Sequence, residues 1–90
     1  MNPYEDKSIT NNSFQRKFTE NVSSEELVWH RDKKDRIVKV LESGNWKIQF
    51  DNQLPVSMKE GDSIFIEKES FHRVIKGDGD LVVEIVELKS

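Results

Sequence analysis

Short alternating segments separated by turn residues constrain the fold of this chain more than any other feature. The segment Trp46-Lys47-Ile48-Gln49-Phe50 alternates strictly, which places Trp46, Ile48 and Phe50 on one face of a strand. Similar segments recur along the chain, and none of them shows the apolar stripe of an amphipathic helix. They lie at residues 13–19, 27–30, 37–41, 46–50, 64–66, 71–75 and 81–88. The pattern predicts an all-β sandwich or barrel.

The length of the chain limits it to one small domain. It has 90 residues, and single domains span about 50 to 250 residues. Residues 1–12 are polar and show almost no apolar periodicity. We therefore expect a flexible N-terminal lead-in over residues 1–12, followed by a single β-barrel domain over residues 13–90.

Two local features predict how the strands are connected and paired. Gly44-Asn45 lies between two apolar segments and is typical of a hairpin turn. In the first segment of the domain, Phe14 and Phe18 flank Arg16, and we interpret this segment as an edge strand. Exposed sheet edges favour pairing with a second chain. The sequence therefore predicts a homodimer through the strand at residues 14–19.

Cysteine content and charge argue against several function classes. The chain has no cysteine, which excludes disulfides and thiolate zinc sites. Its 17 acidic and 14 basic residues are mixed along the sequence and give a net charge of −3, so no basic stripe for nucleic acid is expected. No apolar run is long enough to cross a membrane, and no secretion-signal core is evident. We expect a soluble, cytoplasmic protein.

The chain has only two histidines, and each lies in a β-pattern. Asp32 follows His30 by two residues, so the two side chains would share one face of a strand. His72 lies at the end of the stretch that starts at Gly61. Such a distribution suggests a metal site assembled by folding, although a histidine that is hydrogen-bonded to an aspartate without any metal explains His30 equally simply.

The stretch from Gly61 to His72 resembles the second motif of the cupin superfamily. That motif has a Gly, five residues, a Pro, one residue, a Gly, two residues and a His. Gly61 and His72 stand at the right separation, while Glu67 and Glu69 occupy the positions of the Pro and the second Gly. The spacing of the motif is therefore better preserved than its residue types.

The first cupin motif is similar to residues 30–44 in a degenerate form. The motif has a His, one residue, a second His, three or four residues, a Glu, six residues and a Gly. His30 fills the first place and Asp32 the second, Arg36 or Ile37 replaces the Glu, and Gly44 keeps its place. The resemblance covers about residues 25–88.

This resemblance implies a small single-domain, RmlC-like cupin whose fold is a double-stranded β-helix, the jelly-roll barrel. It assigns metal ligation to His30 and His72, with Asp32 in place of a ligating histidine. Arg36 cannot take the fourth place, because a guanidinium has no lone pair to donate. Two histidines and a carboxylate suit a divalent transition metal such as Fe, Mn, Zn, Ni or Co.

Two arginines and a glutamine are the candidates for binding a small molecule. Arg36 and Arg73 could bind an anionic group, because a guanidinium matches a carboxylate or phosphate. Gln49 lies on the face opposite Trp46, where it would either line a pocket or meet solvent. For Arg36, an ion pair with Asp32 or Asp35 that fills the place of a lost ligand is an equally good interpretation.

The sequence thus leaves two function classes open. The first is a small metal-binding cupin that binds a small molecule, with anionic ligands favoured by the arginines. The second is a metal-free cupin that serves as a non-catalytic ligand-binding or interaction module. No nucleophile stands next to a base in the sequence, so the chain predicts neither a reaction type nor a substrate.

Overall fold

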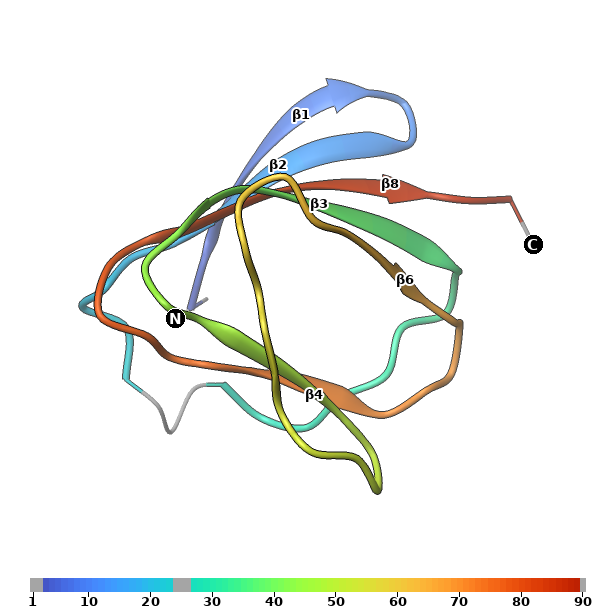
Figure 1. Cartoon of the computed structure of the whole chain (residues 1–90). Helices are drawn as coiled ribbons and strands as arrows, with labels where there is room; N and C mark the ends of the chain where they lie inside the picture. The colour runs from blue at the N-terminus through green and yellow to red at the C-terminus, as the bar shows by residue number, and fades with distance from the viewer. Residues whose placement is uncertain (1–2, 24–26, 90) are drawn as a thin grey trace.

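The structure is a computed structural model that describes residues 3–23 and 27–89, and this part of the chain forms strands and no helix (Figure 1). The strands are β1 Glu5–Thr10, β2 Ser13–Phe18, β3 Arg36–Ser43, β4 Lys47–Phe50, β5 Val56–Ser57, β6 Ser63–Ile66, β7 His72–Ile75 and β8 Leu81–Glu87. The predicted all-β class is confirmed. Within the described ranges there is therefore no helix that could span a membrane.

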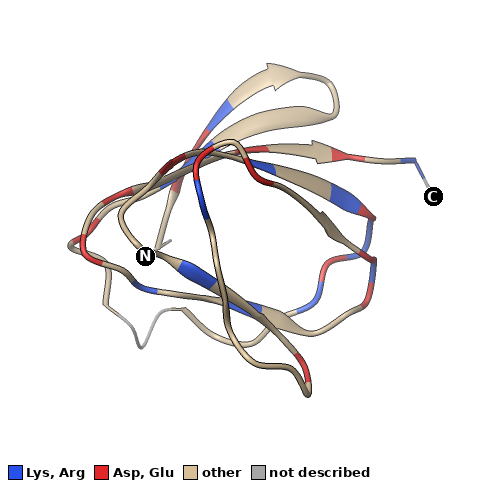
Figure 2. Ribbon diagram, viewed as in Figure 1, with Lys and Arg blue, Asp and Glu red and all other residues tan. Residues whose placement is uncertain are grey.

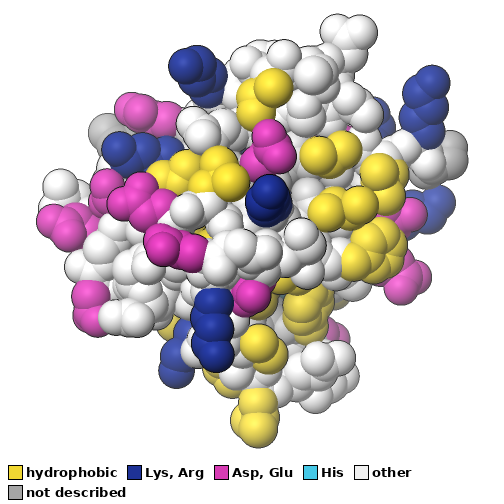
Figure 3. Space-filling model, turned by 45° about the horizontal axis from the view of Figure 1, so that its top comes forward, with side chains coloured by type: hydrophobic (Ala, Val, Ile, Leu, Met, Phe, Trp, Pro, Cys, Tyr) yellow, Lys and Arg dark blue, Asp and Glu magenta, His cyan; other side chains and the backbone are white. Residues whose placement is uncertain are grey.

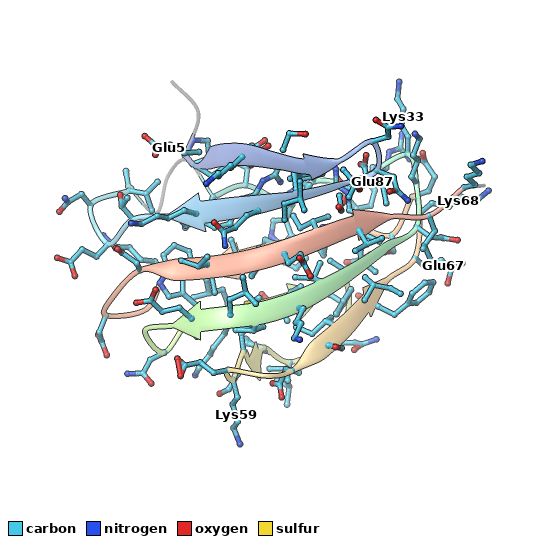
Figure 4. All side chains as sticks on the ribbon, turned by 90° about the horizontal axis from the view of Figure 1, so that it is seen from above. Glu5, Lys33, Lys59, Glu67, Lys68 and Glu87 are labelled. Carbon is cyan, nitrogen blue, oxygen red and sulfur yellow. The ribbon has the colours of Figure 1, made fainter. Side chains whose placement is uncertain are left out.

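The strands form two antiparallel sheets that face each other (Figure 1). The larger sheet has five strands in the order β1-β2-β8-β3-β6, and Figure 4 shows it from above. The smaller sheet has three strands in the order β5-β4-β7. Strands that follow one another in sequence, such as β3 and β4, cross from one sheet to the other, so the chain winds around a common core.

The core fills the space between the two sheets. Trp46 is fully buried, and its indole Nε1 donates a hydrogen bond of 2.6 Å to the carbonyl oxygen of Gly79. Ile48 is also buried and Phe50 is partly buried, which confirms the face predicted from the alternation. The larger sheet contributes the buried side chains of Val38, Val40, Leu81, Val83 and Ile85. Because inward and outward positions alternate along each strand, these residues line one face of their sheet.

The turn at Gly44-Asn45 is not a hairpin turn, contrary to the prediction. β3 and β4 belong to different sheets, so the turn carries the chain between the sheets. It packs against the loop before β8, where the amide of Asp78 donates to the carbonyl oxygen of Gly44 at 2.6 Å. A turn residue pair predicts a reversal of the chain, but it does not specify which strands pair across it.

Gly77→Ala is expected to lower the free energy of unfolding by about 2 kcal/mol or more, because overpacking against backbone cannot be relieved by a rotamer change. A Cβ atom at Gly77 would overlap the carbonyl oxygen of Gly44 and the backbone of Asn45. Gly79→Ala is the matched control, since its Cβ would meet only the Cα of Gly44 at 3.4 Å. Urea unfolding of both variants checks this, and equal effects would contradict it.

The N-terminal segment, expected to be a flexible lead-in, includes a strand, and its flexibility stays a prediction. Residues 5–10 form β1, which pairs with β2, while residues 1 and 2 lie outside the described residues. All side chains of β1 are exposed, so no apolar alternation marked this strand in the sequence. Arg16 of β2 holds β1 through two hydrogen bonds to Asp6, of 2.8 and 2.9 Å. Backbone pairing and this fork-shaped ion pair therefore hold the segment on the sheet.

β2 is not an edge strand, because β1 pairs with one side of it and β8 with the other. The predicted homodimer cannot form by edge pairing through β2. Self-association through another surface stays a prediction. The outer face of the larger sheet does carry exposed apolar side chains, with Ile37 in register with the exposed Phe65 on one side and the partly buried Val86 on the other. Figure 3 shows hydrophobic side chains gathered on the face that is turned toward the viewer.

Candidate functional site

The two histidines are held opposite each other by their own backbones. The amide of His30 donates to the carbonyl oxygen of His72 at 3.0 Å, and the amide of His72 donates back at 2.9 Å. This isolated antiparallel bridge is the only strand-like pairing that the structure gives to the segment at residues 27–30, for which a full strand was predicted. A hydrogen-bonded antiparallel pair projects both side chains to one side, and the two rings lie 4.4 Å apart.

Both imidazole rings are oriented by hydrogen bonds to backbone oxygens. Nδ1 of His30 lies 3.1 Å from the carbonyl oxygen of Val28, and Nδ1 of His72 lies 2.9 Å from that of Ser70. A carbonyl oxygen only accepts, so Nδ1 carries the hydrogen in both rings. In the neutral imidazole, Nε2 then keeps a free lone pair. This is the arrangement in which metal-binding histidines are usually held.

The carboxylate of Asp32 lies close to both Nε2 atoms. Its Oδ2 is 3.2 Å from Nε2 of His72, and its Oδ1 is 4.0 Å from Nε2 of His30. The backbone fixes its position, because the carbonyl oxygen of Asp32 accepts a 2.7 Å hydrogen bond from the amide of Glu69. Oδ2 is buried and has no hydrogen-bond partner among the described residues. An ionised oxygen in this position calls for a cation close by.

The charges around Asp32 keep its carboxyl group ionised. Burial raises the pKa of Asp32, but the close approach of His72 and the charges of Arg36 and His30 lower it by more. The resulting pKa lies below the ordinary value of 3.8. The site therefore offers a carboxylate, not a carboxylic acid, at neutral pH.

In the metal-free protein, this carboxylate is expected to stabilise the fold at neutral pH. Its contribution is present above the ordinary pKa of 3.8 and is lost as the pH falls through the lower pKa of the folded state. Asp32→Asn should therefore reduce the free energy of unfolding more at about pH 7 than at about pH 3. Urea unfolding of chelator-treated proteins measures both values. A reduction of the same size at the two pH values would rule out this role for Asp32.

Arg36, and not Ile37, occupies the inward position where the cupin motif has its Glu. The side chain of Arg36 is 14% exposed, whereas Ile37 lies on the outer face. Its Nη1 is 3.3 Å from Oδ1 of Asp32, while its Nε and Nη2 donate to one carboxylate oxygen of Glu87 at 3.2 and 2.8 Å. Figure 4 shows Glu87 at the end of β8. Arg36 thus links the site to the larger sheet.

These groups lie at the wall of a cavity of about 390 Å³ between the two sheets. His30, Asp32, His72 and Arg36 line it, and most of its other walls are apolar. The apolar lining includes Leu27, Val38, Ile48, Met58, Ile66 and Val83. An apolar chamber with a few polar groups in one place is the usual form of a small-molecule site.

Two of the predicted ligand-binding residues do not reach this cavity. Gln49 and Arg73 are absent from its lining, and Nε of Arg73 donates to Oε1 of Gln49 at 2.9 Å. The guanidinium of Arg73 also lies over the ring of Trp29, 4.8 Å from its centre. Because Gln49 and Arg73 are paired residues of neighbouring strands that alternate with inward positions, both project to the outside of the barrel. They therefore do not contact a ligand in this cavity, and a role in ligand binding elsewhere stays a prediction.

The sequence-based interpretation also missed residues that shape the site. Glu87 follows Leu81, Val83 and Ile85 at every second position of β8, so the same alternation would have placed it on the inner face. Tyr4 and Arg16 also line the cavity. No signal in the sequence marked Tyr4, because its place depends on the pairing of β1 with β2.

The residues present fit a metal ion. His30, Asp32 and His72 each offer one ligand atom, and these atoms all lie within 4.8 Å of one another. The buried Oδ2, which has no hydrogen-bond partner among the described residues, and the two Nε2 lone pairs would all be satisfied by a bound cation. A set of two imidazoles and one carboxylate could hold a divalent transition metal and leave other coordination positions open.

Comparison with known proteins identifies the fold. No protein-family model and no curated protein matches the sequence. A cupin-2 domain protein from Shewanella frigidimarina is 21% identical, with a TM-score of 0.67 over 96% of this chain and 79% of that one. The cobalt(II) form of HppE matches with 14% identity and a TM-score of 0.74, over 98% of this chain and 55% of HppE. The iron(II) form matches with 17% identity and a TM-score of 0.63, over 84% of this chain and 41% of that one.

At these identities the likeness concerns the fold and not the chemistry. The chain spans most of the small Shewanella protein and about half or less of HppE. The TM-scores of 0.63 to 0.74 show that this chain shares the fold of these structures. The chain has the fold of the cupin superfamily.

Proposed function

We propose that this protein is a small metal-binding cupin that holds a small molecule in its cavity. His30, Asp32 and His72 would bind a divalent transition metal, and Arg36 stands beside them to bind an anionic group of the small molecule. The proposal concerns binding and does not extend to a reaction.

One observation carries the proposal. Oδ2 of Asp32 and Nε2 of His72 lie 3.2 Å apart, and Oδ2 has no hydrogen-bond partner among the described residues. With Nδ1 of His72 carrying its hydrogen, the facing atoms of the neutral ring and the carboxylate are both electron-pair donors. Two such atoms repel each other in a buried place unless a proton on the ring or a metal ion lies between them. A metal ion would satisfy both atoms, together with His30.

The comparisons support the same assignment at the level of the fold. HppE, by the names of its two structures, contains Fe(II) or Co(II), so this fold accommodates such ions. When bound here, a metal of this type would act as a Lewis acid with open coordination positions. The protein would supply the apolar walls that exclude water, the rings that are oriented by Val28 and Ser70, and the charge of Arg36.

The second candidate is a metal-free binding module, and one observation favours it. Nη1 of Arg36 lies 3.3 Å from Oδ1 of Asp32, so a fixed positive charge already stands near the carboxylate. Arg36 could thus replace a metal ion as the partner of Asp32. Its ion pair with Glu87 weakens this alternative, because Glu87 accepts hydrogen bonds from Nε and Nη2. Arg36 also leaves Oδ2, on the other side of the carboxylate, without a partner among the described residues.

Elemental analysis of tag-free protein, before and after reconstitution with Fe, Mn, Co, Ni or Zn, tests the proposal. We expect about one metal ion per chain in the wild type and less than about a tenth of that in His72→Ala, because the variant loses one of three ligands. His72 is buried, so His30→Ala serves as a second variant at an exposed ligand position. Arg73→Ala, on the outside of the barrel, is the control. A wild type that stays metal-free after reconstitution would overturn the proposal and favour the metal-free binding module.

A further inference from the structure

We propose that the ligand of this site is a monoanion with a compact apolar body, and that it binds only when the metal is present. Its acid group would lie beside the metal ligands and within reach of Nη1 of Arg36, with its body in the apolar cavity. This inference deepens the proposed function and rests on it.

The charges at the polar end of the cavity define the charge of the ligand. Asp32 contributes one carboxylate to the cavity wall, and the charge of Arg36 is balanced by its ion pair with Glu87. The two imidazoles are neutral when they bind a metal, so a divalent ion gives this group one positive charge. A single negative charge on the ligand would neutralise it, and the attraction depends on the ion.

A second arginine at the cavity, Arg16, has its charge balanced by an aspartate. Arg16 lines the cavity, but its guanidinium forms a two-bond ion pair with Asp6, at 2.8 and 2.9 Å. It also lies 3.6 Å from the centre of the Tyr4 ring. A second negative charge on the ligand would therefore meet a guanidinium whose charge is compensated, and burying that charge would oppose binding.

Nη1 is the donor group of Arg36 that Glu87 does not use, and it forms an ion pair with Asp32 at 3.3 Å. The Nε and Nη2 of Arg36 donate to Glu87, whereas Nη1 makes no hydrogen bond to the residues that the structure describes. Nη1 faces Asp32, so it is directed to the place where the metal ligands meet. The side chain is 14% exposed, which means that an acid group placed there would be largely shielded from water.

The walls of the cavity define the body of the ligand. Most of the lining is apolar, and the volume of about 390 Å³ is near the lower end for small-molecule sites. Tyr4 closes one side, and its ring contacts Phe18 with 5.4 Å between the ring centres. The stacking of Arg16 on Tyr4 holds this wall in place. A compact ring or branched chain fits such a chamber better than a long polar chain.

Calorimetric titration of Co²⁺-loaded protein with three probes of one shape tests the inference. The probes are cyclohexanecarboxylate, the neutral cyclohexylmethanol and the dianion trans-1,4-cyclohexanedicarboxylate. We expect the monoanion to bind at least about tenfold more tightly than either of the others, and only with cobalt present. Arg36→Gln should weaken the monoanion by at least about tenfold, while Arg73→Gln, the control outside the barrel, should not change it.

Cobalt content is measured first on every sample, so that the proposed function and the inference fail separately. Absence of cobalt in the wild type overturns the proposed function, and the inference with it. Bound cobalt without preference for the monoanion overturns the inference alone, as does equal binding of the monoanion after chelation. Arg36→Lys keeps the charge but loses the fork of donors, so it should bind the monoanion more weakly than wild type even if Arg36→Gln does not fold.

Discussion

Asp32→Ala is expected to lower the affinity for Co²⁺ or Zn²⁺ by at least about a hundredfold, since loss of even an outer partner of a metal ligand costs about ten- to a hundredfold. The change removes the only carboxylate of the His30, Asp32 and His72 group. It leaves Arg36 paired with Glu87, so the barrel should remain folded. Competition against a fluorescent metal chelator measures the affinity.

Asp51→Ala is the matched control for this prediction. Asp51 is exposed and lies outside the cavity that Asp32 lines, so its loss should leave the affinity unchanged. Equal affinities of wild type and Asp32→Ala would place any bound metal elsewhere on the chain. In that case a bound cation could no longer account for the buried, unpartnered Oδ2 of Asp32.

Trp46→Ala is expected to cost most of the stability of the fold. Truncating a buried aromatic residue costs about 3 to 5 kcal/mol, and a chain of this size has a free energy of unfolding of only about 5 to 13 kcal/mol. Trp46 has no exposed surface, contacts Phe18 and donates to the carbonyl oxygen of Gly79. The change would leave a cavity and an unpaired carbonyl oxygen at the turn that links the two sheets.

Urea unfolding followed by circular dichroism measures this loss. Trp29→Ala is the control, because Trp29 is 41% exposed and contacts Arg73 on the outside of the barrel. Its loss should change the free energy of unfolding by less than about 1 kcal/mol. Trp46→Phe separates the contribution of packing from that of the hydrogen bond, since it keeps much of the packing and removes the donor to Gly79. Similar losses in the Ala variants of Trp29 and Trp46 would argue against the central role of Trp46.

The sequence predicted the fold because short-range alternation records which side chains face the core. Trp46 and Ile48 are buried as their alternation required. The same principle failed for β1, whose side chains are all exposed. A strand held by backbone hydrogen bonds and by the Arg16 to Asp6 ion pair leaves no apolar pattern to read.

For the site, the sequence supplied His30, Asp32 and His72 as candidates through motif spacing, and the structure brings these three together. The sequence could not decide whether Arg36 binds a ligand beside the metal site or forms an ion pair with a nearby aspartate. The structure shows contacts with both Asp32 and Glu87, and Glu87 lies 51 residues away in sequence. The sequence also suggested Gln49 and Arg73 as ligand-binding residues. In the structure, Arg73 donates a hydrogen bond to Gln49 and neither residue lines the cavity.

By itself, the sequence determined the class of fold, the inward faces of its strands and the candidate residues for a metal site, because local alternation and side-chain chemistry are properties of neighbouring residues. Only the tertiary structure decided that His30 faces His72 and that Arg36 reaches Glu87. It also decided that Gly44-Asn45 joins two sheets and not one hairpin. These relations depend on pairing between distant strands, and the free energy of such pairing comes from the whole packed barrel rather than from any one segment.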